Sequence, residues 1–392
     1  MDEAKVEGTV RLRPGREQRL RRGFPWAVKS EILDVIGNPR PGSVVLAEDS
    51  GGSFVGIGTY FAASFAPLRI LSLNKEKIDQ SFFAKKLEHA WKLRAPLLQK
   101  TNGVRACFSE ADTLPGLVVD SFDGHAVVQV RTLGIENLKP LWLPEVQRIC
   151  GPKSVFERSD YASRTAEGMD PWAGPLTDGC PDSVTINEGL IKMTVPIGGG
   201  LKTGHYLDQR ASRLLLGELV LHGQKVLDLF CYSGGFALQA AKSGAAAVGI
   251  DSSAEAIALA NENAAINSLS ARFQVQNCFD FLQSDEDLYD WIVLDPPAIA
   301  KHRGQKNSLK HAIYKLMTLA APRLTVGGTC IVCSCSHQLS LEEMIATCQD
   351  AASSANSSFS LDRVTLQDID HPAPLSFPES LYLKCLWLRR VN

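Results

Sequence analysis

The second half of the chain alternates apolar, strand-like runs with helical stretches, and this pattern limits the possible folds. The runs are nearly continuous in apolar residues, so each strand is expected to be buried on both faces, as in a parallel sheet covered by helices. The runs are KVLDLFC, AAVGID, ARFQVQNC, WIVLDPP and TCIVCSCS, separated by expected helices over 236–242, 254–266, 309–321 and 341–352. Two last runs, LDRVTLQD and YLKCLWLRRV, have no helix between them and are expected to pair antiparallel at the sheet edge.

The first half is expected to hold two smaller domains. Short β-rich runs with Gly and Pro between them fill residues 1–73, and one helical turn is expected over 16–22. Expected elements further along are helices over 79–99 and 135–150, a hairpin at Asp123-Gly124, a loop over 168–181 and a hairpin over 184–195. The prediction is an α/β protein: a β-rich domain over 1–73, a central α/β domain over 74–196, and a Rossmann-like domain with a mostly parallel sheet over 197–392.

Composition excludes several classes of protein. Hydrophobic residues make up 45% of the 392 residues and charged residues 21%, which is ordinary globular usage. No apolar run reaches the roughly 18 residues that a membrane helix needs, and the N-terminus lacks the layout of a secretory signal. The 10 cysteines show no zinc-ligand spacing, so we expect no metal site and free thiols in a reducing cytoplasm.

Positive charge is concentrated near the N-terminus. Between Thr9 and Lys29 seven Lys or Arg residues accompany one acid, Glu17, although the net charge of the chain is −2. Such a basic patch on a mildly acidic body is typical of a surface that contacts phosphates, the alternative being a solvated charged face. The expected phosphate contacts in this patch are Arg16, Arg19, Arg21 and Arg22.

The turn after the first apolar strand of the second half indicates a cofactor site. Asp228 ends the strand, Gly234-Gly235 follow at the start of a helix, and Asp251 ends the next strand. A dinucleotide site would need the GxGxxG spacing, because a pyrophosphate must approach backbone amides. A carboxylate at Asp228 repels a pyrophosphate and suits the cationic amino-acid end of S-adenosyl-L-methionine (SAM), so SAM is the expected cofactor.

Two further strand ends carry candidate catalytic residues. Asp295 is followed by two prolines that stop the strand, which places a carboxylate where a flipped-out base could be read. Alternation puts Cys333 and Cys335 on one face of the next strand, and Cys335, at its carboxyl end, is the candidate nucleophile. A thiolate that adds to C6 of cytosine makes C5 able to attack a methyl donor. The loop after Asp295 adds expected backbone contacts: Lys301, Arg303 and Lys306.

Other functions remain open at this point. An N-methyltransferase acting on a guanine or adenine would use the Asp295-Pro296-Pro297 backbone carbonyl and would need no cysteine. A non-catalytic RNA-binding assembly factor is a third hypothesis, against which the acids at the strand ends argue. A zinc deaminase would need HxE and PCxxC motifs, and an NAD oxidoreductase would need glycines that the chain lacks.

These motifs together resemble the ribosomal RNA large methyltransferase I family over nearly the whole chain. The resemblance rests on five ordered segments: residues 202–210, residues 228–236, Asp295-Pro296-Pro297, residues 334–337, and the late run through 370–372, 377–379 and 382–384. It implies an N-terminal PUA domain, a central α/β domain and a Rossmann-like methyltransferase domain. It also implies methylation of cytosine C5 in large-subunit rRNA with Cys335 as nucleophile, and it allows a homodimer.

The resemblance implies a set of cofactor-binding residues. Two positions depart from the family pattern: Asn277 stands where an acid usually faces the adenine amino group, and Ala298-Ile299 replace a Lys-Phe pair. An asparagine can still accept a hydrogen bond through its carbonyl oxygen. The expected cofactor-binding residues are Tyr206, Gln209, Arg210, Asp228, Phe230, Cys231, Tyr232, Gly234, Gly235, Asp251, Ser252, Asn277, Cys278, Phe279 and Asp295.

Overall fold

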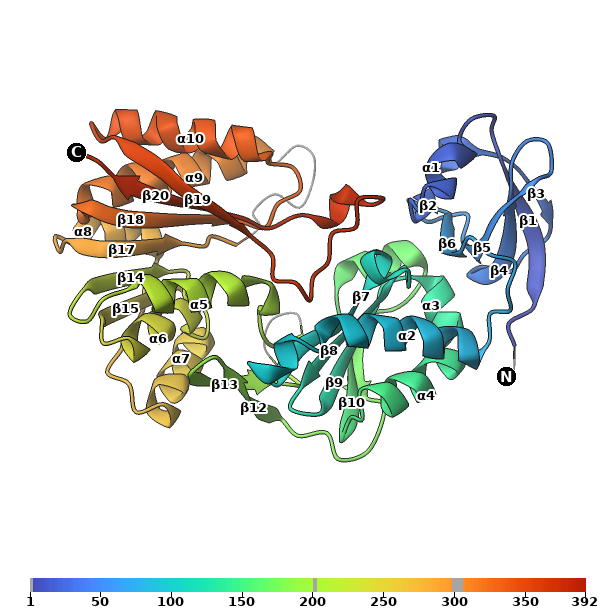
Figure 1. Cartoon of the computed structure of the whole chain (residues 1–392), viewed down its shortest axis with the longest axis horizontal. Helices are drawn as coiled ribbons and strands as arrows, with labels where there is room; N and C mark the ends of the chain where they lie inside the picture. Colours follow the sequence, from blue (N-terminus) through green and yellow to red (C-terminus); the bar gives the residue numbers. More distant parts are fainter. Residues whose placement is uncertain (1–2, 200–202, 298–305) are drawn as a thin grey trace. The chain divides into compact units, whose positions relative to one another are not determined.

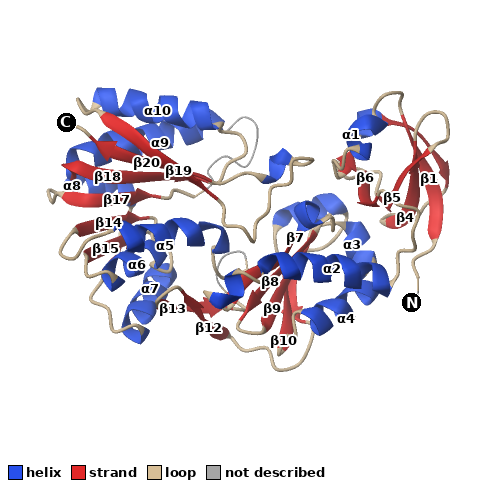
Figure 2. Cartoon of the chain, in the orientation of Figure 1, coloured by secondary structure: helices blue, strands red, loops and turns tan. Residues whose placement is uncertain are grey.

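The chain folds into two units, each of which contains segments distant in sequence (Figure 1). The computed structural model describes residues 3–199, 203–297 and 306–392. The first unit holds Met1–Ile186, Val195–Leu207 and Ile369–Ser380, and the second holds Asn187–Thr194, Asp208–Asp368 and Leu381–Asn392. Both units contain helices and strands, so the predicted α/β class is confirmed (Figure 2).

A seven-stranded sheet forms the centre of the second unit, in the order β16-β15-β14-β17-β18-β20-β19. The first five strands in this order run parallel, and β20 pairs antiparallel with both β18 and β19. The parallel sheet and its antiparallel edge are as predicted. The strands are β14 (Lys225–Leu229), β15 (Ala246–Asp251), β16 (Arg272–Val275), β17 (Tyr289–Leu294), β18 (Leu324–Ser334), β19 (Phe359–Leu366) and β20 (Lys384–Arg390).

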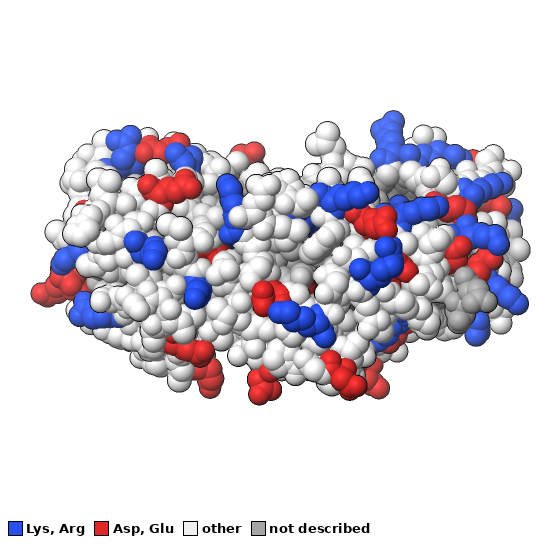
Figure 3. Space-filling model, turned by 60° about the horizontal axis from the view of Figure 1, so that its bottom comes forward, with Lys and Arg blue, Asp and Glu red and all other residues white. Residues whose placement is uncertain are grey.

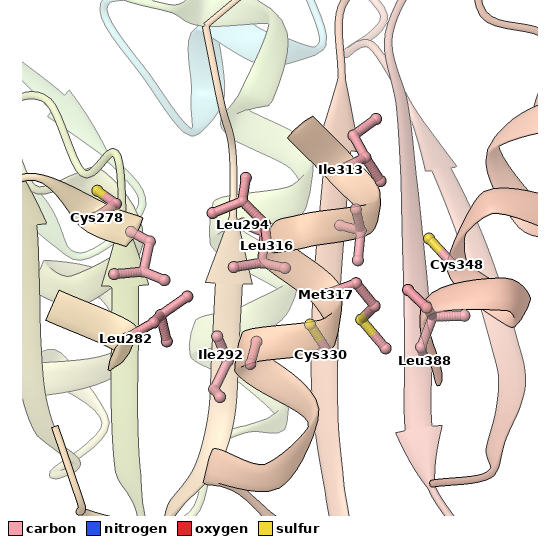
Figure 4. Close-up of a cluster of buried hydrophobic side chains, with 14 of the residues drawn as sticks. Cys278, Leu282, Ile292, Leu294, Ile313, Leu316, Met317, Cys330, Cys348 and Leu388 are labelled. Atoms are coloured by element: carbon pink, nitrogen blue, oxygen red, sulfur yellow. The ribbon is translucent and has the colours of Figure 1, made fainter. Parts of the chain in front are cut away.

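Helices cover both faces of this sheet, which explains the continuous apolar runs. On one face, Ile292 and Cys330 lie in a core with Met317 of α9, as Figure 4 shows. On the other face, the alternate residues Val293 and Ile331 pack with side chains of α5 and α6. The helices are α5 (Arg210–Leu219), α6 (Gly235–Lys242), α7 (Ala254–Ile266), α8 (Cys278–Ser284), α9 (Lys306–Ala320) and α10 (Leu341–Ser354).

Three of these helices begin at residues whose side chains satisfy free N–H groups of a first turn: Ser253 for α7, Asn277 for α8 and Ser340 for α10. Ser253 caps α7 by accepting a hydrogen bond from the Ala256 amide at 3.1 Å. Ser340 and Glu343 form a capping box at the start of α10. The helix starts are therefore fixed locally, and with them the ends of the strands that lead into the helices.

The first unit contains two sheets. A six-stranded sheet has the order β2-β6-β5-β4-β1-β3, and a five-stranded sheet has the order β11-β10-β9-β8-β7. The strands of the first sheet are β1 (Val6–Leu12), β2 (Trp26–Ala27), β3 (Ile32–Gly37), β4 (Ser43–Glu48), β5 (Phe54–Tyr60) and β6 (Leu68–Ser72). Those of the second are β7 (Gly103–Phe108), β8 (Leu117–Phe122), β9 (His125–Val130), β10 (Ser154–Ser159) and β11 (Trp172–Pro175).

The hairpin predicted at Asp123-Gly124 is present between β8 and β9, with φ of +49° and +75° at the two turn residues. The stretch 168–181, expected as a loop, contains β11, whose Trp, Gly and Pro residues do not resemble a strand in the sequence. A kink at Leu138 divides the expected helix over 135–150 into two. The helices of this unit are α1 (Glu17–Arg21), α2 (Gln80–Arg94), α3 (Leu133–Asn137) and α4 (Lys139–Ile149).

The segment Ile369–Ser380 belongs to the first unit although it lies between β19 and β20 in sequence. Its Asp370 accepts a hydrogen bond from the Arg105 amide at 3.0 Å, and its backbone oxygen accepts one from Arg94 at 3.0 Å. Phe377 stacks edge-on against Trp26, with ring centroids 4.8 Å apart. Polar and aromatic contacts thus fix this segment within the unit.

Short elements complete the described chain. The expected hairpin over 184–195 is present as the two-stranded sheet of β12 (Ser183–Glu188) and β13 (Ile191–Pro196). The 3₁₀ helices are η1 (Lys29–Glu31), η2 (Leu97–Gln99), η3 (Ser109–Asp112), η4 (Ala162–Glu167), η5 (Leu207–Gln209), η7 (Ala321–Arg323) and η8 (Pro378–Ser380).

Candidate active site

The turn after β14 holds its backbone in an uncommon conformation. Phe230 and Tyr232 have φ of +62° and +48°, in the left-handed region that residues with side chains rarely adopt. Gly234 has a φ of +83°, and a Cβ there would lie 2.7 Å from Cζ of Phe273. The Tyr232 amide donates to Asp251 at 3.0 Å, which fixes the turn. The turn lies where the strand order reverses between β14 and β17, the usual cofactor position in such sheets.

Cys231 and Gly235 of this turn are packing positions. Cys231 is buried, and burial raises the pKa of its thiol well above the usual range. A Cβ at Gly235 would lie 2.5 Å from Cδ of Arg213. Any contact of these two residues with a cofactor would therefore come from the backbone, and that contact stays a prediction.

Asp228 is a fully buried carboxylate at the end of β14. Its Oδ2 accepts a hydrogen bond from the Ala237 amide at 3.0 Å, and its Oδ1 has no partner among the described residues. Burial raises the pKa of Asp228 from 3.8 to about 8, and the charges of Asp295 and Asp251 act in the same direction. A buried carboxylate with an unpaired oxygen fits a cationic ligand group, so the residues present fit the ammonium of SAM.

Asp251 ends β15 and is half-buried. One carboxylate oxygen accepts from the Tyr232 amide and the other from the Ser253 amide, each at 3.0 Å. Each oxygen can accept a second hydrogen bond, so a ribose diol fits here. Ser252, the next residue, is exposed. The cofactor roles of both residues stay predictions.

Asn277 caps α8 with its side-chain oxygen. That oxygen accepts hydrogen bonds from the Phe279 amide at 2.9 Å and the Asp280 amide at 3.4 Å. Cys278 is buried, accepts a hydrogen bond from the Phe230 amide at 3.3 Å, and has its pKa raised by burial to about 12. The half-buried Phe279 ring packs edge-on against Phe230, with centroids 6.4 Å apart. This cap and ring pair can form one wall of a site for an adenine, and the contact of these residues with the cofactor stays a prediction.

Gln209 links two strand ends. Its Nε2 donates to Asp295 Oδ2 at 3.0 Å, and its Oε1 accepts from the Cys385 thiol at 3.4 Å. Arg210 is 1% exposed and is paired with Asp368 at 2.6 Å. Gln209 and Arg210 were expected to bind the cofactor, and in the structure both bind other residues of the protein.

Tyr206 is half-buried and lies in the segment Val195–Leu207 of the first unit. Its predicted contact with the cofactor, like those of Gln209 and Arg210, stays a prediction.

Asp295 and Cys335 follow neighbouring parallel strands. Leu294 of β17 pairs with Val332 of β18, so the next residues, Asp295 and Cys333, lie at the same level. Because side chains alternate along a strand, Asp295 and Cys333 lie on the face opposite to Leu294 and Val332. Cys335 packs on the same face as Cys333 and lies two residues, about 7 Å, nearer the carboxyl edge. Cys333 is buried, whereas Cys335 is half-buried. Among the predicted thiols at this edge, Cys335 is thus the more accessible.

Of the four arginines expected to contact phosphates, two already form ion pairs within the protein. Arg19 is paired with Glu31 at 2.8 Å, and Arg21 with Asp49 at 3.1 Å. Arg16 and Arg22 are exposed, and neither is paired with an acid among the described residues. Figure 3 shows Lys and Arg side chains gathered at the right end of the face drawn there. We therefore expect Arg16 and Arg22 to contact RNA more directly than their two paired neighbours.

The basic loop after Asp295 is only partly described. Lys301 and Arg303, together with Ala298 and Ile299, lie outside the described residues. Lys306 begins α9 and is paired with Glu343 at 2.6 Å. A role of Lys306 in RNA binding would compete with this pair and stays a prediction.

One residue of the site was not predicted from the sequence. Lys384, at the start of β20, donates through Nζ to the backbone oxygens of Ser336 and Leu339, each at 2.8 Å. It thereby holds the loop that follows Cys335. Lys384 belongs to the segment 382–384 on which the resemblance partly rests, but no role was predicted for it, because a lysine in an otherwise apolar strand can be either solvent-facing or buried.

The described residues were also compared with the requirements of a membrane-spanning helix and of a metal site. No helix in the described part of the chain is long and apolar enough to cross a membrane. Within residues 3–199, 203–297 and 306–392, no three His, Cys, Asp or Glu side chains gather as a metal ion would require.

Comparison with solved structures supports the fold. The protein SMU.776, described as a candidate methyltransferase and complexed with S-adenosylhomocysteine, matches with a TM-score of 0.85 and 19% identity over 99% of this chain and 100% of that chain. A candidate SAM-dependent methyltransferase from Streptococcus mutans matches with a TM-score of 0.82 and 18% identity over 99% of this chain and 100% of that chain. These likenesses cover both units of the fold.

Family models and curated relatives identify the chain. Residues 10–73 match the PUA-like domain and residues 202–358 the methyltransferase small domain. The ribosomal RNA large subunit methyltransferase I of Shewanella denitrificans is 34% identical over 97% of this chain and 98% of its own length. That of Tolumonas auensis is 34% identical over 98% of this chain and 99% of its own length. The predicted family is thus confirmed: the chain belongs to the ribosomal RNA large subunit methyltransferase I family, a family of SAM-dependent rRNA methyltransferases.

Proposed function

We propose that the protein methylates C5 of a cytosine in large-subunit rRNA and that Cys335 is the nucleophile. The observation that supports this most is the relation of Cys335 to Asp295 on neighbouring strand ends. Both residues lie on one face of the sheet, and the half-buried Cys335 is nearer the carboxyl edge by about 7 Å. A pyrimidine ring at this edge could therefore be reached by a carboxylate and by a thiol.

The proposed chemistry uses few residues of the chain. The Cys335 thiolate forms a bond to C6 of the cytosine while protonated Asp295 donates its proton to N3, and Asp295 takes that proton back when the bond between sulfur and C6 breaks. SAM, when bound, supplies the electrophilic methyl group that C5 takes up, its sulfonium leaving as a neutral thioether. The C5 proton is then lost to solvent, the bond between sulfur and C6 breaks, and Cys335 is a thiolate again.

The remaining residues of the site hold the reactants. Asp228 neutralises the ammonium of the cofactor, because its Oδ1 is buried and has no partner in the described chain. Asp251 binds the ribose diol, and Asn277 with Phe279 borders the adenine. Exposed arginines of the PUA-like domain, Arg16 and Arg22, bind rRNA phosphates.

The test replaces Cys335 by Ala and measures methyl transfer to large-subunit rRNA from a strain that lacks the enzyme. We expect activity to fall at least about a thousandfold, because covalent addition at C6 makes C5 nucleophilic. The control is Cys180→Ala, a half-buried thiol that donates to the Val155 and Thr177 backbone oxygens in the first unit. Full activity of Cys335→Ala would exclude the covalent route and favour N-methylation of a purine, which needs only the Asp295-Pro296-Pro297 backbone.

The other predictions about this chain are part of the same proposal. We propose that it acts in the cytoplasm, with large-subunit rRNA as its partner, and that it has three domains over 1–73, 74–196 and 197–392. The homodimer that the resemblance allows is tested by sedimentation of the full chain at micromolar concentration. A monomer under those conditions would exclude the dimer and would leave the proposed chemistry unaffected.

A further inference from the structure

We propose that Lys384 is the positioning residue that holds Cys335 and favours its thiolate form. This inference rests on the proposed function, in which Cys335 is the nucleophile. An ordinary cysteine is mostly protonated at neutral pH, and nucleophilic cysteines gain thiolate character from nearby positive charge. The role that we assign to Lys384 is to supply that charge.

The position of Lys384 follows from the strand register. It begins β20 directly opposite Ser334, the last residue of β18. Its side chain extends past the end of β18, and Nζ donates to the oxygens of Ser336 and Leu339 at 2.8 Å each. The residue directly after Cys335 and the end of the following loop are therefore bound to one ammonium group.

In the described part of the chain, the ammonium of Lys384 has no anionic partner. Lys384 is 9% exposed, and its Nζ bonds only the two carbonyl oxygens among the described residues. An ammonium has three N–H donors, of which the two carbonyl oxygens accept two. A buried cation without an anion is costly, and an anion formed close by would offset this cost. A thiolate at Cys335 is such an anion.

Electrostatics agrees with this geometry. Burial lowers the pKa of Lys384, and negative charge on Cys335 acts in the opposite direction. The interaction is reciprocal, so the Lys384 ammonium would stabilise a negative charge on the Cys335 sulfur. Among the described residues, the other ionisable groups near this end of β18 include His337, Tyr382 with its partner Asp208, Asp295, and the thiols of Cys333 and Cys385. Asp208 and Asp295 are acids that would disfavour a thiolate.

The experiment measures the titration of Cys335 directly. The full-length protein is alkylated with iodoacetamide at a series of pH values, and modification of the Cys335 peptide is quantified by mass spectrometry. In the wild type we expect Cys335 to titrate below the ordinary thiol value of about 8.5. A wild-type titration at or above that value would overturn the proposal without the need for any variant.

Two variants separate charge from packing. Lys384→Met keeps the apolar length of the side chain and removes the charge, so we expect alkylation of Cys335 at pH 7 to slow about tenfold. Lys384→Arg keeps the charge and donors, so its titration should stay close to that of the wild type. An unchanged titration in Lys384→Met, with the native fold confirmed by circular dichroism, would contradict the proposal.

The proposed function is tested separately in the same proteins. If the Lys384 variants shift the Cys335 titration as expected but Cys335→Ala retains full methyl transfer, the covalent route fails while the electrostatic coupling stands. If Cys335→Ala is inactive and the titration does not depend on Lys384, the proposed function stands and this inference fails.

Discussion

Asp228 combines full burial with an unpaired oxygen, an arrangement that destabilises the ligand-free protein. Burial removes water from this carboxylate and raises its pKa from 3.8 to about 8. An uncharged side chain of the same shape would make the folded protein more stable than this buried carboxylate does. We therefore expect Asp228 to serve a function.

The pH dependence of stability tests this residue. The pKa of Asp228 is about 8 in the folded chain against an ordinary 3.8, so the folded state binds the proton more tightly. The free energy of unfolding of the ligand-free protein should therefore fall as pH rises from about 4 to about 8. Asp228→Asn should remove this part of the slope and be more stable than the wild type at pH 8.5, in urea unfolding.

The same variant should bind SAM more weakly, because the ammonium loses its carboxylate. We expect a loss of affinity of at least about tenfold, measured by calorimetry. If the wild type and Asp228→Asn show the same dependence of stability on pH and the same affinity for SAM, Asp228 is an ordinary structural acid.

Gln209 offers a second prediction at the scale of a single residue. Its Nε2 donates to Asp295 at 3.0 Å, so it fixes the carboxylate that we place at N3 of the base. Gln209→Leu should lower kcat about 10–100-fold, as loss of a supporting hydrogen bond does at other sites, with little change in KM for SAM. A rise in KM for SAM at constant kcat would instead support the predicted contact of Gln209 with the cofactor.

At the scale of elements, the start of α6 depends on a glycine. Gly234 has a φ of +83°, and an added Cβ would lie 2.7 Å from Cζ of Phe273. Gly234→Ala should lose about 1–3 kcal/mol from backbone strain, with a further loss from the contact with Phe273. Gly223 is a matched control because it has the same φ of +83° and no atom within 4 Å of its Cβ position. Equal losses in the two alanine variants, in urea unfolding, would show that the contact with Phe273 costs nothing.

Apolar periodicity predicted most elements of the second unit but not α5 or α8. Arg210 and Arg213 interrupt the apolar face of α5, and both are buried because they pair with acids from distant segments, Asp368 and Glu188. A sequence pattern treats such residues as exposed, so the helix was not expected. The short α8 depends on the cap by Asn277, which the sequence analysis interpreted only as a ligand residue.

The strand-end part of the candidate site could be predicted because parallel strands bring their carboxyl ends to one edge. Asp228 and Asp251 lie at the carboxyl ends of β14 and β15, and Asp295 directly follows β17. Lys384 could not be predicted, because its place depends on the register of β20 against β18, which pairs residues 50 positions apart: Ser334 and Lys384. Periodicity carries no information on such pairings.

At the scale of the whole chain, the segment Ile369–Ser380 shows the same limit. Asp370 bonds the Arg105 amide 265 positions away, and Phe377 stacks on Trp26 of the N-terminal sheet. These contacts place a late motif within the first unit, which no local pattern indicates. The motif was predicted as part of the resemblance, without a structural role.

Binding of RNA by the whole protein should depend on salt and on the unpaired arginines. The double variant Arg16→Ala/Arg22→Ala should reduce the slope of log affinity against log salt by about 1–2, because two phosphate contacts are lost. Arg21→Ala should change the slope less, because Arg21 is already paired with Asp49 at 3.1 Å. A filter-binding series from 50 to 300 mM salt, with an rRNA fragment as probe, distinguishes these outcomes. Equal slopes in the wild type and the double variant would place the RNA-binding surface elsewhere.

The most direct test of the covalent mechanism is trapping of the enzyme on RNA. A large-subunit rRNA transcript that contains 5-fluorocytosine cannot lose the group at C5, so the bond between sulfur and C6 should persist after methyl transfer. With SAM present, we expect a denaturation-resistant complex whose peptide map places the RNA on Cys335, and no complex with Cys335→Ala. A protein that methylates ordinary rRNA but forms no such complex, or forms it through another cysteine, would contradict the account.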